Sequence, residues 1–507
     1  MLCTRTMCTL APMARHTCSC VVFLFLAFMT SPSLSHRVAI IGGGIGGSSA
    51  AHFLRQLRPD VEIVLYEKRP EVGGRMTTID VSGQVFEAGA AILHPRNLYM
   101  KNFTELLGLS AKLDETESFG VYDDRLYMVK SSSSPMSVPR DLFNILRHWG
   151  FDPFKIDSMV ASLLNDFDRL YRVQDGGRHF RTVDELFDAA TPDGTFRHMR
   201  RSDAAWYARN LWGLSAATVC QLLGAFAHVN YNQDGDTLNA FVMAVTLAGV
   251  QDGLWAVEGG NQEVCRGLLD NADVALRHQA VNAVQRLDRA SSSVEYQVSA
   301  GSGEADVFDA VVIATPLQHS GIELNGFAHS ASTMHRGEYQ RTVVTFVVGQ
   351  PSNEYFGLDA SSSTSFPMAI AVSTSAVAPF SCIGMPGSTI HKEPAQNESV
   401  WKIFSPEPLD DGTLDKLFRA RQHVTVREFA AFPKYSSTPV ELPSFVLDQA
   451  VFYTSPIEWA ASAMEMSAIS GRNAALLANA ALSRRSCLES GHRSSDSEQS
   501  CAAPPGG

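Results

Sequence analysis

Unbroken apolar runs recur in the first, middle and last parts of the chain. These runs are VAII (38–41), EIVLYE (62–67), FDAVVIATPL (308–317) and VFYTSP (451–456). Strands that are buried on both faces of a parallel sheet show such runs, whereas strands with one exposed face alternate. Segments with the apolar spacing of a helix follow two of these runs, at 45–57 and 460–480. The pattern therefore predicts a parallel sheet with covering helices, assembled from segments that lie far apart in the sequence.

Two blocks separate these runs. The chain is mostly helical from about 140 to 250 and rich in strand-like segments from about 340 to 430. Two shorter segments, 275–284 and 294–298, alternate between apolar and polar residues. We therefore expect an α/β fold, in which a Rossmann-type nucleotide-binding domain carries an inserted α+β substrate domain.

A glycine cluster joins the first strand to the first helix. VAIIGGGIGG contains G-x-G-x-x-G at Gly42, Gly44 and Gly47, and the next strand ends at Glu67. In such a loop the first glycine allows a tight turn, the second admits a pyrophosphate, and the third lets helix and strand pack closely. The phosphates then lie at the positive end of the helix, and the acid binds a ribose diol. The motif predicts a dinucleotide cofactor, and the carboxylate of Glu67 disfavours the 2′-phosphate of NADP.

Composition limits the classes of partner. The 507 residues carry a formal net charge of −12 without a basic block, which argues against nucleic acid as a partner. No CxxC or Cys/His cluster suggests a metal site. After the first 35 residues, no run approaches the roughly 18 apolar residues of a spanning helix, so we expect no transmembrane span in the mature chain.

The first 35 residues have the pattern of a signal peptide. Arg5 and Arg15 precede the apolar VVFLFLAFM (21–29), and small residues follow it. An uncleaved anchor is the alternative. Sequons at Asn102 and Asn397 fit a secretory route. The N-terminus therefore predicts a glycoprotein of the secretory pathway.

The residues after Glu67 distinguish between dinucleotides. Gly73, Gly74 and Arg75 form a Gly-Gly-Arg element. This element resembles the second signature of the flavin enzymes related to amine oxidases and phytoene desaturases, where it lies near the flavin phosphates and ring. Nicotinamide-only dehydrogenases usually lack it. The resemblance implies FAD rather than NAD.

Three further segments resemble the same flavoproteins. FDAVVIATP resembles their third segment, with Thr315 at the strand end. Val281 matches the position whose backbone contacts adenine, and Glu458 matches the acid of the C-terminal segment that binds FAD. Alanines in EWAASAMEM replace the usual glycines there, which puts the detailed contacts of that segment in doubt.

The middle of the chain resembles one family closely. HVNYNQD (228–234), NAFVMAVTLAG (239–249), GLWAVEGGNQEVCRGLL (253–269) and EAGAAILHPRN (87–97) are similar to strings of the prenylcysteine oxidases. The resemblance runs from about Arg37 to Leu477. The family also contains a prenylcysteine oxidase-like branch. It implies a lysosomal or secreted FAD-dependent thioether oxidase. Its substrates would be farnesyl- or geranylgeranyl-cysteine from the breakdown of prenylated proteins, and O2 would be the acceptor. The products would be cysteine, a prenyl aldehyde and hydrogen peroxide.

Catalytic residues are harder to assign, because hydride removal beside a thioether needs orientation more than a strong base. Glu87, His94 and Asn97 lie in a loop that resembles the flavin-adjacent loop of the superfamily. Glu87 and His94 are the catalytic candidates; His94 could orient water or the substrate carboxylate, or serve as a hydrogen-bonded structural residue. Trp255 and Glu258 could line the pocket or support the turn that follows them.

Other functions remain open at this stage. A flavin amine oxidase would need an aromatic cage and usually a lysine behind the flavin, and the sequence offers no clear candidate. A non-catalytic FAD-binding secreted glycoprotein is the third hypothesis. The apolar helices at 206–227 and 239–250 are candidate walls of a prenyl channel, although ordinary core helices have the same pattern.

These assignments divide the chain into seven expected segments. They are a signal peptide (1–35), a first FAD-binding part (36–130), a helical substrate-domain part (131–255), a second FAD-binding part (256–335), a β-rich substrate-domain part (336–435), a C-terminal FAD-binding segment (436–482) and a disordered tail (483–507).

Overall fold

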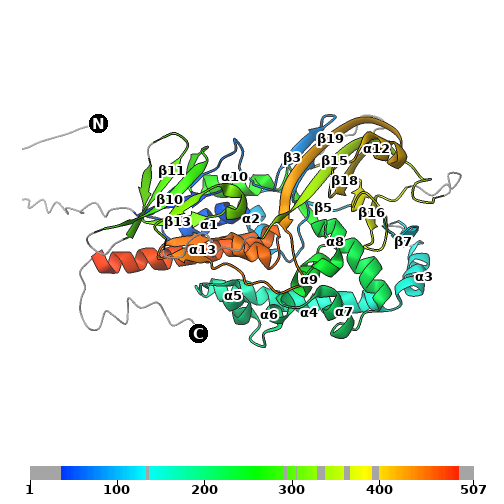
Figure 1. Ribbon diagram of the computed structural model, residues 1–507, viewed down its shortest axis with the longest axis horizontal. Coiled ribbons are helices and arrows are strands. Elements are labelled where there is room, and N and C mark those ends of the chain that lie inside the picture. The colour runs from blue at the N-terminus through cyan, green and yellow to red at the C-terminus, as the bar shows by residue number, and fades with distance from the viewer. Residues whose placement is uncertain are drawn as a thin grey trace, which may run out of the picture. The chain divides into compact units, whose positions relative to one another are not determined.

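Strands from distant parts of the chain form a six-stranded sheet in the computed structural model (Figure 1). In sheet order they are β20 (Val446–Asp448), β21 (Val451–Tyr453), β13 (Ala310–Ile313), β1 (Arg37–Ile41), β2 (Glu62–Tyr66) and β9 (Ala275–Arg277). Strands β21 to β9 are parallel, and β20 pairs antiparallel with β21. The parallel sheet assembled from separated segments is thereby confirmed.

The structure describes residues 36–132, 136–289, 294–303, 305–327, 337–358, 366–390 and 399–489. These ranges belong to one unit that begins at His36. The expected signal peptide, the sequon at Asn397 and the chain after Glu489 lie outside the described residues. No helix within the described ranges is long and apolar enough to cross a membrane.

Alternate residues of β1 face two different layers. Val38 and Ile40 pack in the core formed with the helices, whereas Ala39 and Ile41 pack against a second sheet. The helices of the first layer are α1 (Ile45–Leu57), α10 (Gln262–Asn271) and α13 (Met464–Glu489). The second sheet has the order β12 (Asp306–Phe308), β11 (Val294–Ala300), β10 (Val281–Asp288) and β14 (Glu323–Asn325). Burial on both faces explains why these strands carry unbroken apolar runs.

A seven-stranded sheet forms the β-rich part of the inserted region. Its order is β19 (Phe418–Pro433), β15 (Tyr339–Pro351), β18 (Val400–Ser405), β17 (Cys382–Gly384), β16 (Ala369–Val372), β6 (Phe119–Tyr122) and β7 (Leu126–Lys130). Strand β6 pairs with β16, some 250 residues later in the chain. The expected boundary at residue 130 therefore differs from the structure, because strand pairing across this distance has no local sequence signal.

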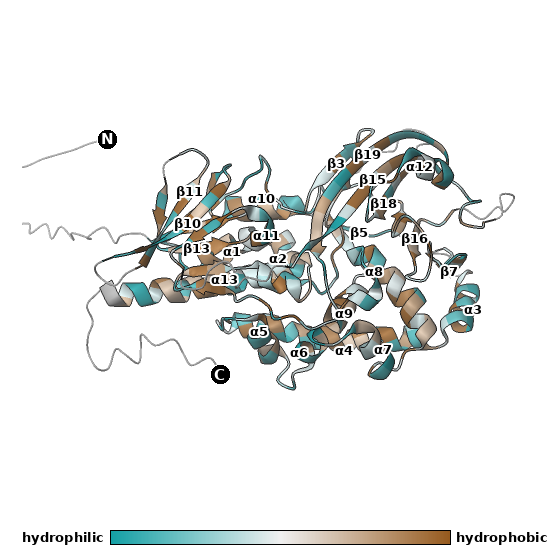
Figure 2. Cartoon of the chain, in the orientation of Figure 1, coloured by the Kyte–Doolittle hydropathy of each residue, from teal (hydrophilic) through white to brown (hydrophobic). Residues whose placement is uncertain are grey.

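Helices form the rest of the inserted region. They are α3 (Val138–Trp149), α4 (Asp152–Asp175), α5 (Val183–Ala190), α6 (Thr195–Arg200), α7 (Ala204–Asn210), a π-helical turn at Thr218–Leu223, α8 (Gly224–Tyr231), a short helix at Gly235–Thr237 and α9 (Ala240–Ala248). Figure 2 shows apolar stretches along α4, α7 and α9, with polar positions between them. Their apolar faces pack together in the same core cluster as β1 and α13.

Short elements connect these layers. They are β3 (Thr78–Val81), β4 (Gln84–Glu87), α2 (Leu98–Leu106), β5 (Ala111–Leu113), β8 (Trp255–Val257), α11 (Leu317–Ser320), α12 (Asp411–Leu417) and the 3-10 helix η4 (Ser455–Trp459). Strands β3 and β4 form a hairpin, and β5 pairs with β8.

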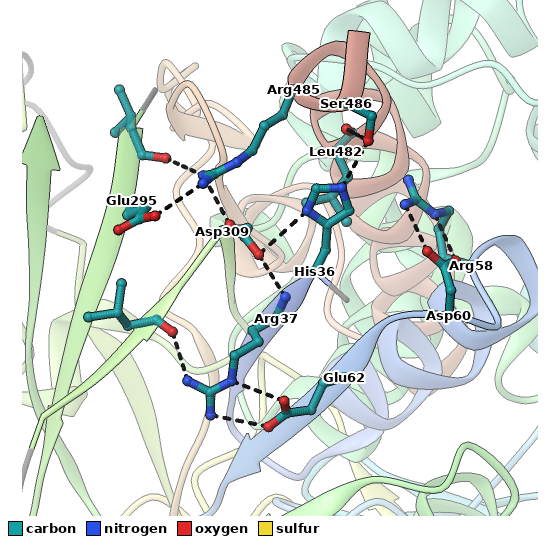
Figure 3. A network of polar contacts seen from close by, with 12 residues as sticks. His36, Arg37, Arg58, Asp60, Glu62, Glu295, Asp309, Leu482, Arg485 and Ser486 are labelled. Atoms are coloured by element: carbon teal, nitrogen blue, oxygen red, sulfur yellow. Dashed lines mark hydrogen bonds and ion pairs between the residues drawn. The ribbon is translucent and has the colours of Figure 1, made fainter. Parts of the chain in front are cut away.

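The end of α13 corrects the expected start of the disordered tail at residue 483. The helix continues to Glu489, and its last turns are bound to the sheets (Figure 3). Arg485 forms ion pairs with Glu295 at 3.1 Å and with Asp309 at 3.0 Å. The hydroxyl of Ser486 lies 2.9 Å from Nε2 of His36. The polar composition of this segment suggested disorder, and its partners, 176 to 450 residues away, give no local sequence signal.

Candidate functional site

The glycine loop between β1 and α1 leaves no room for side chains at two positions. Gly42 has φ +110°, and a Cβ there would lie 2.7 Å from the carbonyl oxygen of Ala314. A Cβ on Gly47 would lie 1.9 Å from the carbonyl oxygen of Gly42. The loop is therefore folded tightly against the end of β13, as the motif predicts.

Gly44 is open where the other two glycines are crowded. The nearest atom to a Cβ there would be Cα of Gly74, at the ordinary contact distance of 3.6 Å. Gly44 also begins α1, whose N-terminus has no side-chain cap and no acid in its first turn. A helix N-terminus with this form is a binding place for phosphate groups. The cradle that a side chain would fill fits the pyrophosphate of FAD.

The two glycine motifs are in direct contact. Gly73 N donates to Gly43 O at 2.8 Å. The buried carboxylate of Glu67 accepts hydrogen bonds from Gly43 N at 2.8 Å and from Arg69 N at 3.0 Å. Because each carboxylate oxygen can accept more than one hydrogen bond, Glu67 can bind a ribose diol as well as holding the loop.

Thr315 and Val281 follow β13 and β9, two strands of the six-stranded sheet, beyond the carboxyl ends of those strands. Thr315 follows β13, and its Cβ lies 3.5 Å from the place that a Cβ on Gly42 would take. Val281 begins β10 shortly after Arg277, whose carbonyl accepts a hydrogen bond from Glu67 N at 3.0 Å. Cofactors bind α/β sheets at the carboxyl ends of the strands, so this position suits the predicted contacts.

Arg75 and the buried carboxylate of Glu458 form a partly exposed ion pair that joins the Gly-Gly-Arg element to the C-terminal segment. Arg75 Nη2 donates to Glu458 Oε2 at 2.6 Å, and Nη1 donates to Ala431 O at 2.7 Å. Burial lowers the pKa of Arg75, but Glu458 together with Tyr339 and Tyr435 outweighs this effect, so the pKa of Arg75 is raised. The pair shows that two segments 383 residues apart meet at one site.

Aromatic residues surround Glu458 and the loop that follows it. The hydroxyl of Tyr339 lies 3.3 Å from Glu458 Oε2, and its ring lies edge-on to Trp459. The Tyr435 hydroxyl donates to Glu458 O at 2.9 Å and accepts from Ser462 N at 2.8 Å. Sequence analysis found no such cluster, because these residues come from separate segments. These hydroxyl groups hold the segment in which alanines replace the usual glycines.

Glu87 supports the loop that carries His94. Asn261 N donates to Glu87 Oε1 at 2.5 Å, and Asn261 Nδ2 donates to the carbonyls of Ala90 and Ala91 at 3.0 Å. Oε2 of Glu87 is buried without a hydrogen-bond partner in the structure. Burial raises the pKa of Glu87 to about 7, although the Asn261 amide and the charge of Lys402 oppose the rise. Glu87 thus positions the loop and keeps one carboxylate oxygen unpaired.

Both ring nitrogens of His94 have partners in the protein. Arg96 N donates to Nδ1 at 3.1 Å, and since a backbone N–H can only donate, Nδ1 accepts. Nε2 lies 3.2 Å from Gln251 Oε1 and therefore carries the proton. Burial lowers the pKa of His94. The ring is neutral and fixed, so it would have to give up a hydrogen bond before it could transfer a proton.

The other candidates of this loop have supporting contacts. Asn97 Oδ1 accepts from His94 N at 2.7 Å, directly before α2. Trp255 pairs with Leu93 through both backbone groups, and its indole N–H donates to His94 O at 3.2 Å. Glu258 N donates to Ser110 O at 2.9 Å, after the end of β8. Trp255 thus supports the strand and loop from a buried position.

An apolar pocket lies between α4, α6, α9 and the start of α13. Its cavity volume is about 70 Å³, below the roughly 300–1,000 Å³ typical of small-molecule sites. Its apolar wall includes Val160, Leu164, Phe167, Phe196, Phe241 and Met466. Of the two helices expected to form a channel, α9 lines this pocket, whereas α4 and α6 supply the remaining helical wall. The apolar lining suits a hydrocarbon group, and a long chain would require the pocket to widen.

Polar groups gather at one part of this pocket. His94, Arg96 and Asn97 line it, together with Glu465 from α13. Arg96 pairs with Asp168 through Nη2, and its Nη1 donates to Asn165 Oδ1 at 3.0 Å. A guanidinium has five N–H donors, so further donors of Arg96 can serve a ligand. Sequence analysis missed Arg96, which stands in the quoted string HPRN but resembles any exposed arginine.

Glu465 links the pocket to α2. Its carboxylate accepts from Tyr99 N at 2.7 Å, from Met100 N at 3.0 Å and from the Tyr171 hydroxyl at 2.8 Å. Burial raises the pKa of Glu465 to about 7, and these three donors limit the rise. Two residues later, Ser467 O lies 3.7 Å from the place that a Cβ on Gly46 would take. The start of α13 therefore borders both the pocket and the glycine loop.

Lys402 on β18 is a partly buried cation beside Glu87. Its Nζ donates to Glu87 O at 2.8 Å and lies 4.8 Å from the centroid of the Phe404 ring. Burial lowers the pKa of Lys402 to about 8, against the influence of the Glu87 carboxylate. The string VWKIFS does not mark this lysine, because a single polar residue in a strand is most often exposed. Within the described ranges, His, Cys, Asp and Glu form no group of three that could hold a metal ion.

Comparison with protein families decides where the chain belongs. A family described as prenylcysteine lyase matches residues 135–489, and an NAD(P)-binding Rossmann-like domain matches residues 40–107. The chain belongs to the prenylcysteine lyase family. The family resemblance expected from the sequence strings is thus confirmed.

Curated relatives carry related names. Prenylcysteine oxidase 1-like from Mus musculus is 34% identical over 458 residues, which cover 87% of this chain and 90% of the relative. Prenylcysteine oxidase 1 from Homo sapiens is 34% identical over 457 residues, which cover 87% and 88%. The two branches match equally well, so identity does not assign the chain to either.

Solved structures share the fold. Putrescine oxidase bound to putrescine aligns with a TM-score of 0.57 and 15% identity, covering 87% of this chain and 98% of the other. A putative protoporphyrinogen oxidase from Exiguobacterium sp. 255-15 aligns with a TM-score of 0.56 and 14% identity, covering 88% and 99%. Together with the Rossmann-like match, this fold and the family indicate an oxidoreductase that uses a flavin.

Proposed function

We propose that this protein is an FAD-dependent oxidase that cleaves the thioether of farnesyl-cysteine and geranylgeranyl-cysteine during the breakdown of prenylated proteins. The observation that carries the proposal is the apolar pocket with charged groups at one part, which borders the same helix start as the glycine loop. A prenylcysteine has this division into a long apolar chain and a zwitterionic head. The names of the curated relatives support the same substrate class.

The reaction balances without a further cofactor. Prenylcysteine, water and O2 give cysteine, a prenyl aldehyde and hydrogen peroxide. The carbon between the sulfur and the allylic double bond loses two electrons, and O2 gains them. The C–S bond breaks, the sulfur leaves with a proton as the thiol, and the oxygen atom of water becomes the aldehyde oxygen. FAD, when bound, supplies the acceptor for the hydride that leaves this carbon.

The protein's own residues orient the substrate. The walls from α4, α6 and α9 bury the prenyl chain and hold it in one direction. Binding then supplies the ordering of the substrate before the reaction, which lowers the entropic part of the barrier. Arg96 binds the carboxylate of the cysteine moiety, because a guanidinium matches a carboxylate in charge and geometry. His94 is neutral, and both of its ring nitrogens are hydrogen-bonded. Its ring accepts from the backbone N–H of Arg96 and so holds the loop that carries Arg96. Gly44, Glu67, Arg75 and Glu458 would hold the cofactor.

A peroxide assay tests the proposal. Purified protein with farnesyl-cysteine in air should yield one hydrogen peroxide for each cysteine released, and amines such as putrescine should yield none. Without oxygen, farnesyl-cysteine should bleach the yellow protein, and air should restore the colour. NADPH should do neither, since the described structure and sequence carry one dinucleotide motif, at Gly42.

One observation favours a second candidate, a flavin amine oxidase. Aromatic rings gather around Glu458, and the partly buried Lys402 has a pKa lowered to about 8. Peroxide from amines but not from prenylcysteine would support this function. A yellow protein that neither group of substrates bleaches would support the non-catalytic FAD-binding glycoprotein.

We also propose that the protein enters the secretory pathway and acts in lysosomes or after secretion. Asn102 is exposed on α2, whereas the hydroxyl of Thr104 in the same sequon is buried and donates to Met100 O at 2.8 Å. Glycosylation at Asn102 would therefore precede the packing of α2. N-terminal sequencing should find a chain that starts near residue 35, and glycosidase treatment should lower its mass. An unglycosylated protein that retains Met1 would contradict this proposal.

A further inference from the structure

Helix α4 borders two hollows with two adjacent lines of side chains. Val160, Leu163, Leu164 and Phe167 face the apolar pocket, with the spacing of one helix face. A second line faces a more open groove on the surface, which Phe154, Ser158 and Ser162 help to form. Leu163 lines both hollows. The pocket and the groove therefore meet at this side chain.

The groove exposes large apolar side chains. Phe151 is 70% exposed, Phe154 is 48% exposed, and Leu211 from the end of α7 is 52% exposed. The rings of Phe151 and Phe154 lie 6.4 Å apart between centroids. An exposed apolar cluster of this kind beside a ligand pocket is typical of a binding surface.

The charge in the groove is already neutralised. Lys155 pairs with Asp152 at 2.8 Å and donates to Gly213 O at 3.0 Å. Its ammonium group therefore has two acceptors, and the groove presents mainly Phe, Leu and Trp side chains to a ligand. An apolar ligand suits this lining better than an ionic one.

We propose that the groove receives the distal isoprene unit of a geranylgeranyl chain, and that Leu163 divides the space used by a farnesyl chain from the space used by the longer chain alone. This inference rests on the proposed function and adds a determinant of chain length to it. The occupant follows from adjacency: Leu163 lines both the apolar pocket and the groove, so a chain that extends past Leu163 from the pocket would enter the groove. The two chains differ by one five-carbon unit, so a small group of side chains can distinguish them.

Ser162→Trp is the main test, because it fills the groove from an exposed position beside Leu163. We expect kcat/KM for geranylgeranyl-cysteine to fall about tenfold relative to farnesyl-cysteine, which equals about 1.4 kcal/mol. Ala161→Trp is the matched control, since Ala161 is exposed on the same helix and lines neither hollow. Leu163→Ala should shift the ratio of the two kcat/KM values toward the longer chain. A ratio within twofold of wild type in both Ser162→Trp and Leu163→Ala would overturn the inference.

The introduced tryptophan provides a second measurement that does not depend on turnover. In Ser162→Trp, geranylgeranyl-cysteine should shift the added tryptophan emission to shorter wavelength, and farnesyl-cysteine should not. If the wild-type protein turns over neither substrate, the proposed function fails. This binding measurement still shows whether the groove receives the distal isoprene unit. Equal emission shifts with both ligands would overturn the inference. So would loss of binding to lipid vesicles in Ser162→Trp with an unchanged substrate ratio, which would assign the groove to a lipid surface.

Discussion

The glycine loop and the apolar pocket border the same end of α13, yet they are built from different materials. The loop is backbone: Gly42, Gly44 and Gly73 shape it, and it offers a ligand the N–H groups of a helix start. The pocket is built from the side chains of α4, α6, α9, α13 and the loop around His94. A backbone site needs a few residues in fixed order, whereas a side-chain pocket needs a shape that many sequences can fill.

This difference explains where function can vary. Every member of a fold can keep the same nucleotide loop while its pocket accepts another substrate. The shared fold with putrescine oxidase at 15% identity is consistent with that view. Substitutions in the loop should therefore remove the cofactor, and substitutions in the pocket should change selectivity.

The largest expected effect comes from single alanines in the glycine loop. Gly44→Ala should fold, because its Cβ would have an ordinary 3.6 Å contact with Gly74, but it should lower FAD affinity by on the order of 100-fold, about 2.8 kcal/mol. The reason is that the methyl group takes the place of the pyrophosphate. Gly47→Ala should instead lower stability by about 3 kcal/mol or more, since its Cβ would lie 1.9 Å from Gly42 O.

Flavin absorbance and thermal unfolding separate these two outcomes. A folded, colourless Gly44→Ala protein beside a poorly folded Gly47→Ala protein is the expected pair. A yellow Gly44→Ala protein with wild-type FAD content would show that the cradle does not hold the pyrophosphate.

The second effect concerns Arg96 at the polar part of the pocket. Arg96→Gln should lower kcat/KM for farnesyl-cysteine by roughly 10- to 100-fold, the value of a hydrogen bond to a charged group. The methyl ester of the same substrate lacks the carboxylate charge, so its turnover should fall much less. Arg169→Gln is the control, because Arg169 lies on α4 and pairs with Asp166 outside the pocket lining. Equal losses for acid and ester would assign Arg96 a structural part only.

Sequence alone predicted the loop and the sheet better than the pocket. Unbroken apolar runs located β1, β2 and β13, because burial on both faces leaves a local pattern. The alternating segment 275–284 is in fact two strands, β9 and β10, in different sheets. Local alternation does not specify the partner strand. For the same reason, the sequence did not predict that β6 and β7 belong to the seven-stranded sheet.

The candidate site shows the same division. Gly42, Gly44, Gly47 and Glu67 stand in one motif, and the structure brings them together with Gly74. Their binding of FAD stays a prediction. Arg96, Lys402 and the contact of Tyr339 with Glu458 could not be predicted, because in each case the partner lies more than 70 positions away. Exposed and buried lysines or arginines look alike until the fold is known.

The third effect is a pH dependence of stability from Glu87, which supports the loop that carries His94. Its pKa rises from 4.5 to about 7 on folding, chiefly through burial. The folded protein therefore binds the proton more tightly, and the stability that this gives is complete below pH 4.5 and is lost as pH rises through 7. The free energy of unfolding of the wild-type protein should differ between pH 5 and pH 7.5, and Glu87→Gln should remove at most about 3 kcal/mol of that difference.

Urea unfolding at these two pH values measures the difference. Glu105→Gln, which changes an exposed acid on α2, should leave the pH dependence as in wild type. Lys402, with a pKa lowered to about 8, begins to lose its proton only at the upper end of this window, so its contribution is small. An unchanged pH slope in Glu87→Gln would mean that Glu87 is ionised in the folded protein at acidic pH.

The smallest effect distinguishes the last turns of α13 from the tail that composition suggested. Arg485 binds Glu295 and Asp309 with its side chain 17% exposed, whereas Arg484 is exposed. Partly exposed ion pairs contribute about 1 kcal/mol or less, so Arg485→Ala should lower the free energy of unfolding by about that amount. Arg484→Ala should change it little, although both variants remove one positive charge. If the two variants unfold at the same urea concentration, the network in Figure 3 does not stabilise the fold, and residues 483–489 behave as the composition indicates.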